Sequence, residues 1–266
     1  MLLLCVIVVT VLLLAAANDE FLYKGRLVLT RDDPQLKQLA RDPSDAVPFA
    51  KWKQMLPPKD LVTHKRFSTC AVVGSSGAVL RQRQGAAIDR SELIVRFNLA
   101  PTGEQFAPFV GSRTTWRFIN DPLWLRSHLH LSAQDRGRIF TQCVSSGSGI
   151  FKFSTNITNN TVGARQKHFD ECIHPRFMDH VMSLLPKPPR QNAIFAEQRP
   201  TTGLVAVLML ANICDNLAVF GFDHRNETYH YWDSGRTKRI GVHQWSFEAA
   251  LLRKMQALRL LFVKKP

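Results

Sequence analysis

Two short segments of this sequence have the residue types and spacing to hold a phosphate group. The apolar run Cys70-Ala-Val-Val-Gly74 leads into Ser75-Ser76-Gly77, and Arg199-Pro-Thr-Thr-Gly203 precedes an apolar stretch that begins at Leu204. A strand that ends in a glycine turn, and a helix that begins with small hydroxyl residues, both direct backbone N–H groups at an anion. Neither segment has the spacing of a dinucleotide fingerprint or a Walker loop, which argues against nicotinamide and ATP as ligands. Each segment taken alone also fits a plain structural turn.

The elements that would carry these turns alternate between strands and helices. Strands are expected at 70–74, 93–97, 114–119 and 217–221, of which the second ends at Asn98 and the third at Asn120. A helix is expected over 204–213 with Thr201 or Thr202 as its N-cap, and the stretch 247–263 reads as a helix that leads into a final strand. This alternation predicts an α/β fold with a Rossmann-like, mostly parallel sheet flanked by helices. Residues 121–199 read as loops and insertions.

The N-terminal segment indicates the compartment. Residues 1–17 are apolar and carry no charged side chain. About 20 apolar residues are needed to span a bilayer, so the segment fits a signal-anchor at the lower limit of length, and it also fits a cleaved signal peptide. Both interpretations put the rest of the chain in the secretory lumen. Residues 18–64 are polar and interrupted by prolines, which predicts a stem before a single catalytic domain over 65–266.

The sequons and the cysteines agree with a lumenal location. Sequons for N-glycosylation begin at Asn156, Asn159 and Asn226. Apart from Cys5 in the apolar segment, the chain has four cysteines, namely Cys70, Cys143, Cys172 and Cys214. In an oxidising compartment these four allow up to two disulfides in any of three pairings, with free thiols or a metal site as alternatives.

The charge balance is strongly basic. The formal net charge is +14 and the isoelectric point is close to 10.0. In the secretory lumen a basic chain meets nucleotide-sugars, acidic glycans and anionic membrane surfaces, so nucleic acid is not expected as a partner. A solvated surface without a particular partner is the alternative explanation of the charge.

Four groups of residues resemble the sialylmotifs of the eukaryotic-type sialyltransferases, in the order that this family has. Residues 70–77, 88–89, 95–102 and 110–115 resemble the large motif. Residues 199–204, 213–215 and 219–222 resemble the small motif, His230-Tyr-Trp-Asp233 resembles the third, and His243 with Glu248 has the His-x-x-x-x-Glu spacing of the last. The resemblance covers about residues 66–248 and is nearly absent from 121–198.

This resemblance implies roles for individual residues. Contacts to the cytidine nucleotide are implied for Ser75, Asn98, Asn120, Thr201, Thr202 and Gly203, although many members have Asn where this chain has Ser75. His243 takes the position of the general base, and His230 takes that of a hydrogen-bond donor to the departing phosphate. Glu248 lies five residues after His243, about 140° around an ideal helix, so the two cannot share a helix face and Glu248 is assigned an orienting or structural role. Tyr231, Trp232 and Trp245 either pack in the core or stack on the donor.

The resemblance implies a sialyltransferase with a GT-A-like variant of the Rossmann fold. Such an enzyme transfers sialic acid from CMP-sialic acid to a glycan acceptor on a glycoprotein or glycolipid, with inversion. No cofactor is implied, and no metal is expected because the chain lacks an Asp-x-Asp pair. The family implies a Golgi membrane location, or secretion if residues 1–17 are cleaved, and a disulfide between Cys70 and Cys214 that leaves Cys143 to pair with Cys172. Transfer of another CMP-activated acid such as Kdo, and a non-catalytic glycan- or CMP-binding module, are the alternatives.

Overall fold

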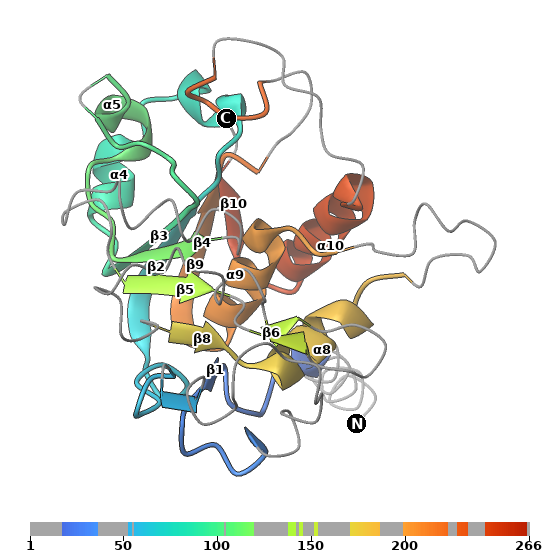
Figure 1. Ribbon diagram of the computed structural model, residues 1–266. Helices are drawn as coiled ribbons and strands as arrows, with labels where there is room; N and C mark the ends of the chain where they lie inside the picture. The colour runs from blue at the N-terminus through green and yellow to red at the C-terminus, as the bar shows by residue number, and fades with distance from the viewer. Residues whose placement is uncertain are drawn as a thin grey trace, which may run out of the picture.

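The computed structural model describes an α/β domain built on one eight-stranded sheet (Figure 1). The described residues are 18–36, 53–54, 56–103, 105–119, 138–141, 144–145, 152–153, 171–186, 199–222, 228–233 and 243–264. The strands of the large sheet are β1 (Val28–Leu29), β2 (Phe67–Val73), β3 (Leu93–Phe97), β4 (Trp116–Ile119), β5 (Arg138–Thr141), β8 (Glu171–Ile173), β9 (Cys214–Phe220) and β10 (Phe262–Lys264). A separate antiparallel pair consists of β6 (Val144–Ser145) and β7 (Lys152–Phe153).

The strand order of the large sheet is β1-β8-β5-β4-β3-β2-β9-β10, and every pairing except that of β1 with β8 is parallel. From β2 the chain proceeds through β3, β4, β5 and β8 in one direction across the sheet. It then returns to add β9 on the other side of β2. The sheet therefore has a topological switch point between β2 and β9, which is where open parallel sheets bind ligands, beyond the carboxyl ends of the strands. The predicted Rossmann-like, mostly parallel sheet is confirmed.

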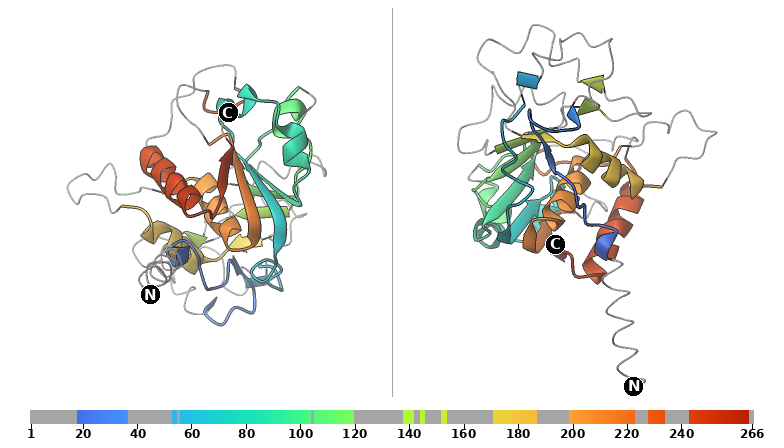
Figure 2. Two further views of the ribbon diagram at one scale, coloured as in Figure 1. Left: turned by 180° about the vertical axis from the view of Figure 1, so that it is seen from behind. Right: turned by 90° about the horizontal axis from the view of Figure 1, so that it is seen from below.

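Both faces of the sheet are covered, and the described helices are η1 (Gly77–Arg81), α4 (Gly85–Asp89), α5 (Ala107–Val110), α8 (Pro175–Ser183), α9 (Thr202–Ala211) and α10 (Trp245–Ala257). Side chains alternate along each strand, so Val72 packs with α8, α9 and α10 while Ala71 packs with η1, α4 and α5. The helices α9 and α10 lie on one side of the sheet and α4 and α5 on the other (Figures 1 and 2).

Helix α9 is the central helix of the larger core. Its residues Leu204 to Leu210 are all buried, which explains why the sequence there shows an unbroken apolar run without a polar face. The helix begins two residues earlier than the predicted range, and its N-cap is Thr201, whose hydroxyl accepts a hydrogen bond from the Leu204 N–H at 3.0 Å. The positive end of this helix therefore has a fixed position at the end of the sheet.

The described parts of the predicted stem pack against the sheet. Strand β1 pairs antiparallel with β8, and Phe21, Leu27 and Val62 are buried in the larger core. Lys254 of α10 forms an ion pair with Glu20 at 2.6 Å. In the sequence these apolar residues are separated by prolines and polar residues, so no helix or strand pattern predicted their burial. The packed domain thus begins well before residue 65.

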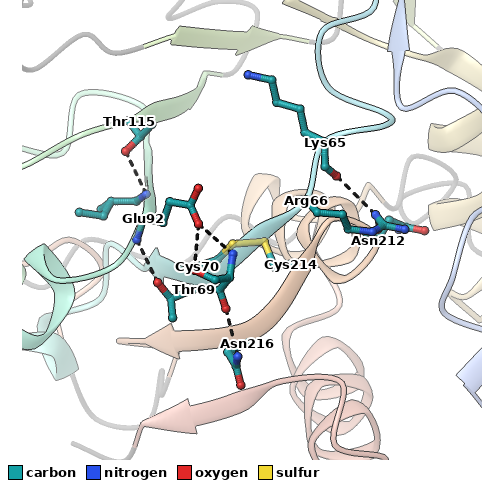
Figure 3. The surroundings of a disulfide bond; sticks show 11 residues. Lys65, Arg66, Thr69, Cys70, Glu92, Thr115, Asn212, Cys214 and Asn216 are labelled. Carbon is teal, nitrogen blue, oxygen red and sulfur yellow. Dashed lines mark hydrogen bonds between the residues drawn. A yellow bond between two sulfur atoms is a disulfide. The ribbon is translucent and has the colours of Figure 1, made fainter.

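A disulfide joins Cys70 of β2 to Cys214 of β9, as the family resemblance implied. It connects neighbouring strands whose cysteines are 144 residues apart in sequence and whose Cα atoms are 6.1 Å apart (Figure 3). Close by, the Glu92 N–H donates to Thr69 Oγ1 at 3.1 Å. Cys172 is also disulfide-bonded, and because Cys143 lies outside the described residues, their pairing stays a prediction.

Several predicted features lie outside the described residues, namely the segment 1–17, Asn120 and the sequons at Asn156, Asn159 and Asn226. Among the helices that are described, none combines the length and the apolar character required to cross a membrane.

Candidate functional site

A cleft lies at the switch point and gathers residues that are far apart in the sequence. The predicted site residues that line it are Ser75, Asn98, Thr201, Thr202, Gly203, His230 and His243. Aromatic side chains complete the lining, namely Phe97, Phe222, Tyr229 and Trp245. A second cavity, near Arg66, Asn212 and Cys214 at the other end of β2 and α9, contains none of the predicted residues.

Two glycines allow the turns after β2 and β9 to approach each other closely. A Cβ atom on Gly74 would lie 2.7 Å from the carbonyl oxygen of Gly221, so a larger residue does not fit there. Gly221 itself has φ of 68°, a conformation that favours glycine. Gly74 lines the cleft at this close approach of the two turns.

The turn after β2 is also hydrogen-bonded to the segment 228–231. The Tyr231 N–H donates to the Ser75 carbonyl at 2.8 Å, and the Gly77 N–H donates to the Thr228 carbonyl at 3.1 Å. These bonds connect the Ser75 turn to the segment that carries His230.

Asn98 follows directly on β3 in a left-handed backbone conformation with φ of 45°. Asparagine tolerates this conformation better than most non-glycine residues do. Its N–H donates to the Phe118 carbonyl at 2.9 Å, so the residue is attached to the next strand of the sheet. The left-handed turn ends the strand and places Asn98 in the lining of the cleft.

Glu248, in the first turn of α10, holds the N-terminus of α9 in place. Its carboxylate accepts hydrogen bonds from the Thr201 N–H at 2.8 Å and from the Thr201 hydroxyl at 2.5 Å. Burial raises the pKa of Glu248 to about 7, although the two hydrogen bonds from Thr201 act in the opposite direction. The partner of Glu248 is thus the N-cap residue beside Thr202 and Gly203.

His243 lies two residues before α10, so it does not share a helix with Glu248. Its Nδ1 is 2.8 Å from the carbonyl oxygen of Arg199. A carbonyl oxygen only accepts hydrogen bonds, so Nδ1 must carry a proton. In the neutral ring the lone pair is therefore on Nε2, which is the arrangement that a general base requires. The ring also contacts Trp245 edge to face, with centroids 5.3 Å apart.

His230 has a different partner, because its Nδ1 is 2.8 Å from Oδ2 of Asp233. The ring lies parallel to that of Trp232, with centroids 4.5 Å apart. A carboxylate oxygen only accepts hydrogen bonds, so Nδ1 donates to Asp233, and this bond fixes the orientation of the ring. Asp233 is an acidic partner that sequence reasoning did not assign, although it belongs to the His-Tyr-Trp-Asp motif.

Tyr231 and Trp232 both pack against other side chains of the domain, and neither lines the cleft. Tyr231 is buried, its hydroxyl donates to the Pro101 carbonyl, and its ring packs edge to face on Phe106. It is therefore part of the core and does not line the cleft. Trp232 packs on both His230 and Tyr231, and so it supports the orientation of the His230 ring.

The aromatic residues Phe222 and Tyr229 were not singled out from the sequence as site residues. Phe222 lies against Gly203, where an added Cβ would be 3.0 Å from the ring. Tyr229 contacts both His230 and Trp245. Phe222 is the last residue of the small-motif segment 219–222 and Tyr229 directly precedes His230, but only the fold brings them to the cleft. Among the described residues, no group of three or more His, Cys, Asp or Glu side chains is placed to hold a metal ion.

Comparisons with known proteins point to one family. Residues 38–259 match the sequence profile of glycosyltransferase family 29 (sialyltransferase). The chain is 31% identical over 206 residues to a CMP-N-acetylneuraminate-beta-galactosamide-alpha-2,3-sialyltransferase 1 from Sus scrofa, covering 72% of this chain and 55% of the relative. It is 25% identical over 231 residues to a Sialyltransferase-like protein 3 from Oryza sativa subsp. indica, covering 73% of this chain and 57% of the relative. The chain thus spans little more than half the length of these curated relatives.

Solved structures are similar in fold. A crystal structure of a mammalian sialyltransferase is 23% identical and has a TM-score of 0.66, with 95% of this chain and 94% of the other covered. A complex of a mammalian sialyltransferase with Gal-beta-1-3GalNAc-ortho-nitrophenol matches with the same identity and TM-score. At this level of identity the likeness concerns the fold.

Proposed function

Because the chain belongs to glycosyltransferase family 29, the sialyltransferases, we propose that it transfers sialic acid from CMP-sialic acid to a hydroxyl group of a glycan. The observation that carries this proposal is the orientation of His243. Its Nδ1 is occupied by the Arg199 carbonyl at 2.8 Å, which leaves Nε2 as the basic atom of a side chain that lines the cleft.

The proposed reaction is a single displacement at the anomeric carbon. The acceptor hydroxyl gives its proton to His243 Nε2 while its oxygen bonds to the anomeric carbon of the sugar acid. The bond from that carbon to the phosphate oxygen breaks on the opposite face, and CMP leaves with the bonding electrons. Attack opposite the leaving group inverts the configuration at the anomeric carbon.

Departure of CMP requires stabilisation of negative charge on its phosphate. Two features of the cleft favour this, namely the N-terminus of α9 at Thr202 and Gly203 and the side chain of His230. Asp233, whose Oδ2 is 2.8 Å from His230 Nδ1, holds the ring in position for this role. Ser75 and Asn98, on the turns after β2 and β3, are proposed to contact the cytidine nucleotide.

The acceptor is proposed to be a glycan on a glycoprotein or glycolipid, and the location to be the Golgi membrane with the catalytic domain in the lumen. A metal-independent mechanism is part of the same proposal, because the sequence has no Asp-x-Asp pair. The segment 1–17 supports membrane attachment or secretion through its composition.

The test is a transfer assay on the full chain with CMP-sialic acid and, separately, CMP-Kdo as donors. Gal-beta-1-3GalNAc is a suitable first acceptor because a solved mammalian sialyltransferase was captured with a derivative of this disaccharide, and a glycan array extends the search. We expect transfer from CMP-sialic acid. Transfer from CMP-Kdo alone would reassign the donor, and CMP binding without any transfer or CMP release would indicate a non-catalytic binding module.

A further inference from the structure

Two arginine side chains are fully buried in the centre of the sheet. Arg96 of β3 and Arg117 of β4 occupy paired positions in the parallel register, and each has a relative exposure of 0%. Burying a guanidinium group is costly unless its N–H groups are hydrogen-bonded, and an apolar side chain would fill the same space without this cost. Arginine at these positions therefore indicates a need for hydrogen-bond donors inside the domain.

The acceptors of Arg117 lie in the turn that follows β3. Its Nη1 donates to the carbonyl oxygen of Asn98 at 2.8 Å and to that of Ala100 at 3.1 Å. These carbonyl groups lie beyond the end of the strand, where the regular ladder of the sheet has stopped. The two N–H groups of this one nitrogen bridge both carbonyl oxygens and thereby fix the shape of the turn.

The turn needs this support because Asn98 has a left-handed backbone with φ of 45°. Such conformations are unfavourable for a residue with a Cβ atom and persist where the surrounding structure holds them. Strand β4 holds Asn98 at both of its backbone polar groups. The Phe118 carbonyl accepts its N–H at 2.9 Å, and Arg117 donates to its carbonyl oxygen.

We propose that Arg117 is a positioning residue for nucleotide binding, which acts by holding Asn98 in the conformation that presents its side chain to the cleft. This inference rests on the proposed function, because it takes Asn98 as a contact of the CMP group. Arg117 itself does not line the cleft and does not touch the nucleotide. Its effect on affinity passes through Asn98.

Arg96 provides a matched control. It is equally buried and carries the same charge on the adjacent strand, but its guanidinium donates to the Val110 carbonyl at 2.7 Å, the Arg113 carbonyl at 2.9 Å and Thr114 Oγ1 at 3.1 Å. None of these three residues lines the cleft. Loss of Arg96 should therefore destabilise the domain without a specific effect on the Asn98 turn.

The experiment is a double-mutant cycle in the full chain, with CMP affinity measured by isothermal titration calorimetry. The variants are Arg117→Met, Asn98→Ala and the combination of the two, with Arg96→Met as control and thermal unfolding recorded for each. We expect Arg117→Met to raise the Kd for CMP about tenfold in the wild-type background and less than about threefold when Asn98 is already alanine. Arg96→Met should change the Kd less than about threefold while lowering the melting temperature.

Two results would overturn the inference. The first is that Arg117→Met raises the Kd for CMP by the same factor in the wild-type chain and in the Asn98→Ala variant. The second is that Arg96→Met raises this Kd as much as Arg117→Met does. If Arg117→Met does not fold, Arg117→Lys takes its place in the same cycle, because the lysine nitrogen lies one bond closer to the backbone than Nη1. A rise of a few fold in the Kd for CMP is then expected, and this rise should disappear in the Asn98→Ala background. A wild-type chain that binds no CMP would contradict the proposed function itself, whereas additive effects in a chain that binds CMP would contradict only the role of Arg117.

Discussion

The two histidines of the cleft differ in the hydrogen-bond partner of their Nδ1 atoms. His243 faces a carbonyl oxygen and His230 faces a carboxylate, each at 2.8 Å. The carbonyl oxygen accepts from Nδ1 of His243 and so leaves the lone pair of the neutral ring on Nε2, whereas the Asp233 carboxylate is a charged hydrogen-bond partner that fixes the His230 ring. These partners agree with the proposal that His243 accepts the acceptor proton and that His230 donates a hydrogen bond to the leaving phosphate.

Replacement of the general base tests this assignment. We expect His243→Ala to lower turnover by about 10² to 10⁴ while the Kd for CMP changes only a few fold, because the base acts on the acceptor proton. Asn98→Ala is the control and should mainly weaken donor binding, by about 1 to 3 kcal/mol. Steady-state kinetics with saturating donor and acceptor separate the two effects. If His243→Ala keeps more than about a tenth of wild-type turnover, His243 is not the base and His230 is the next residue to test.

Glu248 predicts a pH dependence of stability. Its pKa is about 7 in the folded chain against 4.5 for an ordinary glutamate, so the folded state holds more protons than the unfolded state between these values. The free energy of unfolding should therefore be highest at the acid end of this window and fall by about 3 kcal/mol as the pH rises to 7. In Glu248→Gln this contribution is absent.

Denaturant unfolding at pH 5, 6, 7 and 8 checks the effect through the difference between wild type and Glu248→Gln, in which other titrating groups cancel. The free energy of unfolding of the variant should rise relative to that of the wild type as the pH rises. A constant difference across the series would show that Glu248 titrates as it does in the unfolded chain.

At the level of secondary structure, strands that end in asparagine or glycine were predictable and the packing of the remaining elements was not. The apolar runs that form β2, β3 and β4, and the hydroxyl N-cap of α9, carry their signals within a few residues. In contrast, β1 has two residues and acquires its place from the antiparallel pairing with β8. Arg96 and Arg117 resemble exposed strand residues in the sequence, and only the three-dimensional turn contacts explain their burial.

The disulfide between β2 and β9 should matter for stability more than for the site. Cys70 and Cys214 connect strands already paired in parallel, away from the carboxyl ends that form the cleft. Replacing both by alanine should lower the free energy of unfolding by about 4 to 5 kcal/mol, because the bond closes a long loop in the unfolded chain. The Kd for CMP should stay within about threefold of wild type when both are measured under folding conditions.

Chemical denaturation and calorimetry with CMP measure the two quantities on the same preparation. The wild type assayed in parallel with intact disulfides is the reference. An unchanged unfolding midpoint, or a loss of CMP affinity of tenfold or more in a folded variant, would contradict this separation.

For the molecule as a whole, the order of the strands brings the residues of the cleft together. Ser75, Asn98, Thr201, His230 and His243 come from segments spread over most of the chain, and the switch between β2 and β9 brings them to one edge of the sheet. The family resemblance predicted these residues by position, but it did not predict the hydrogen bonds that orient them. Those bonds involve backbone carbonyls such as that of Arg199, which no side-chain pattern reveals.

The same arrangement predicts how the proposed transfer reaction responds to chelation of divalent cations. The proposed stabilisation of the departing phosphate comes from the N-terminus of α9 and from His230 held by Asp233, both of which are parts of the chain itself. Transfer from CMP-sialic acid should therefore continue in excess EDTA at close to the untreated rate. The measurement is the initial rate before and after chelation, with added Mn²⁺ and Mg²⁺ as further arms. A complete loss of transfer that Mn²⁺ restores would mean that a cation, and not this pair of features, balances the charge of the leaving CMP.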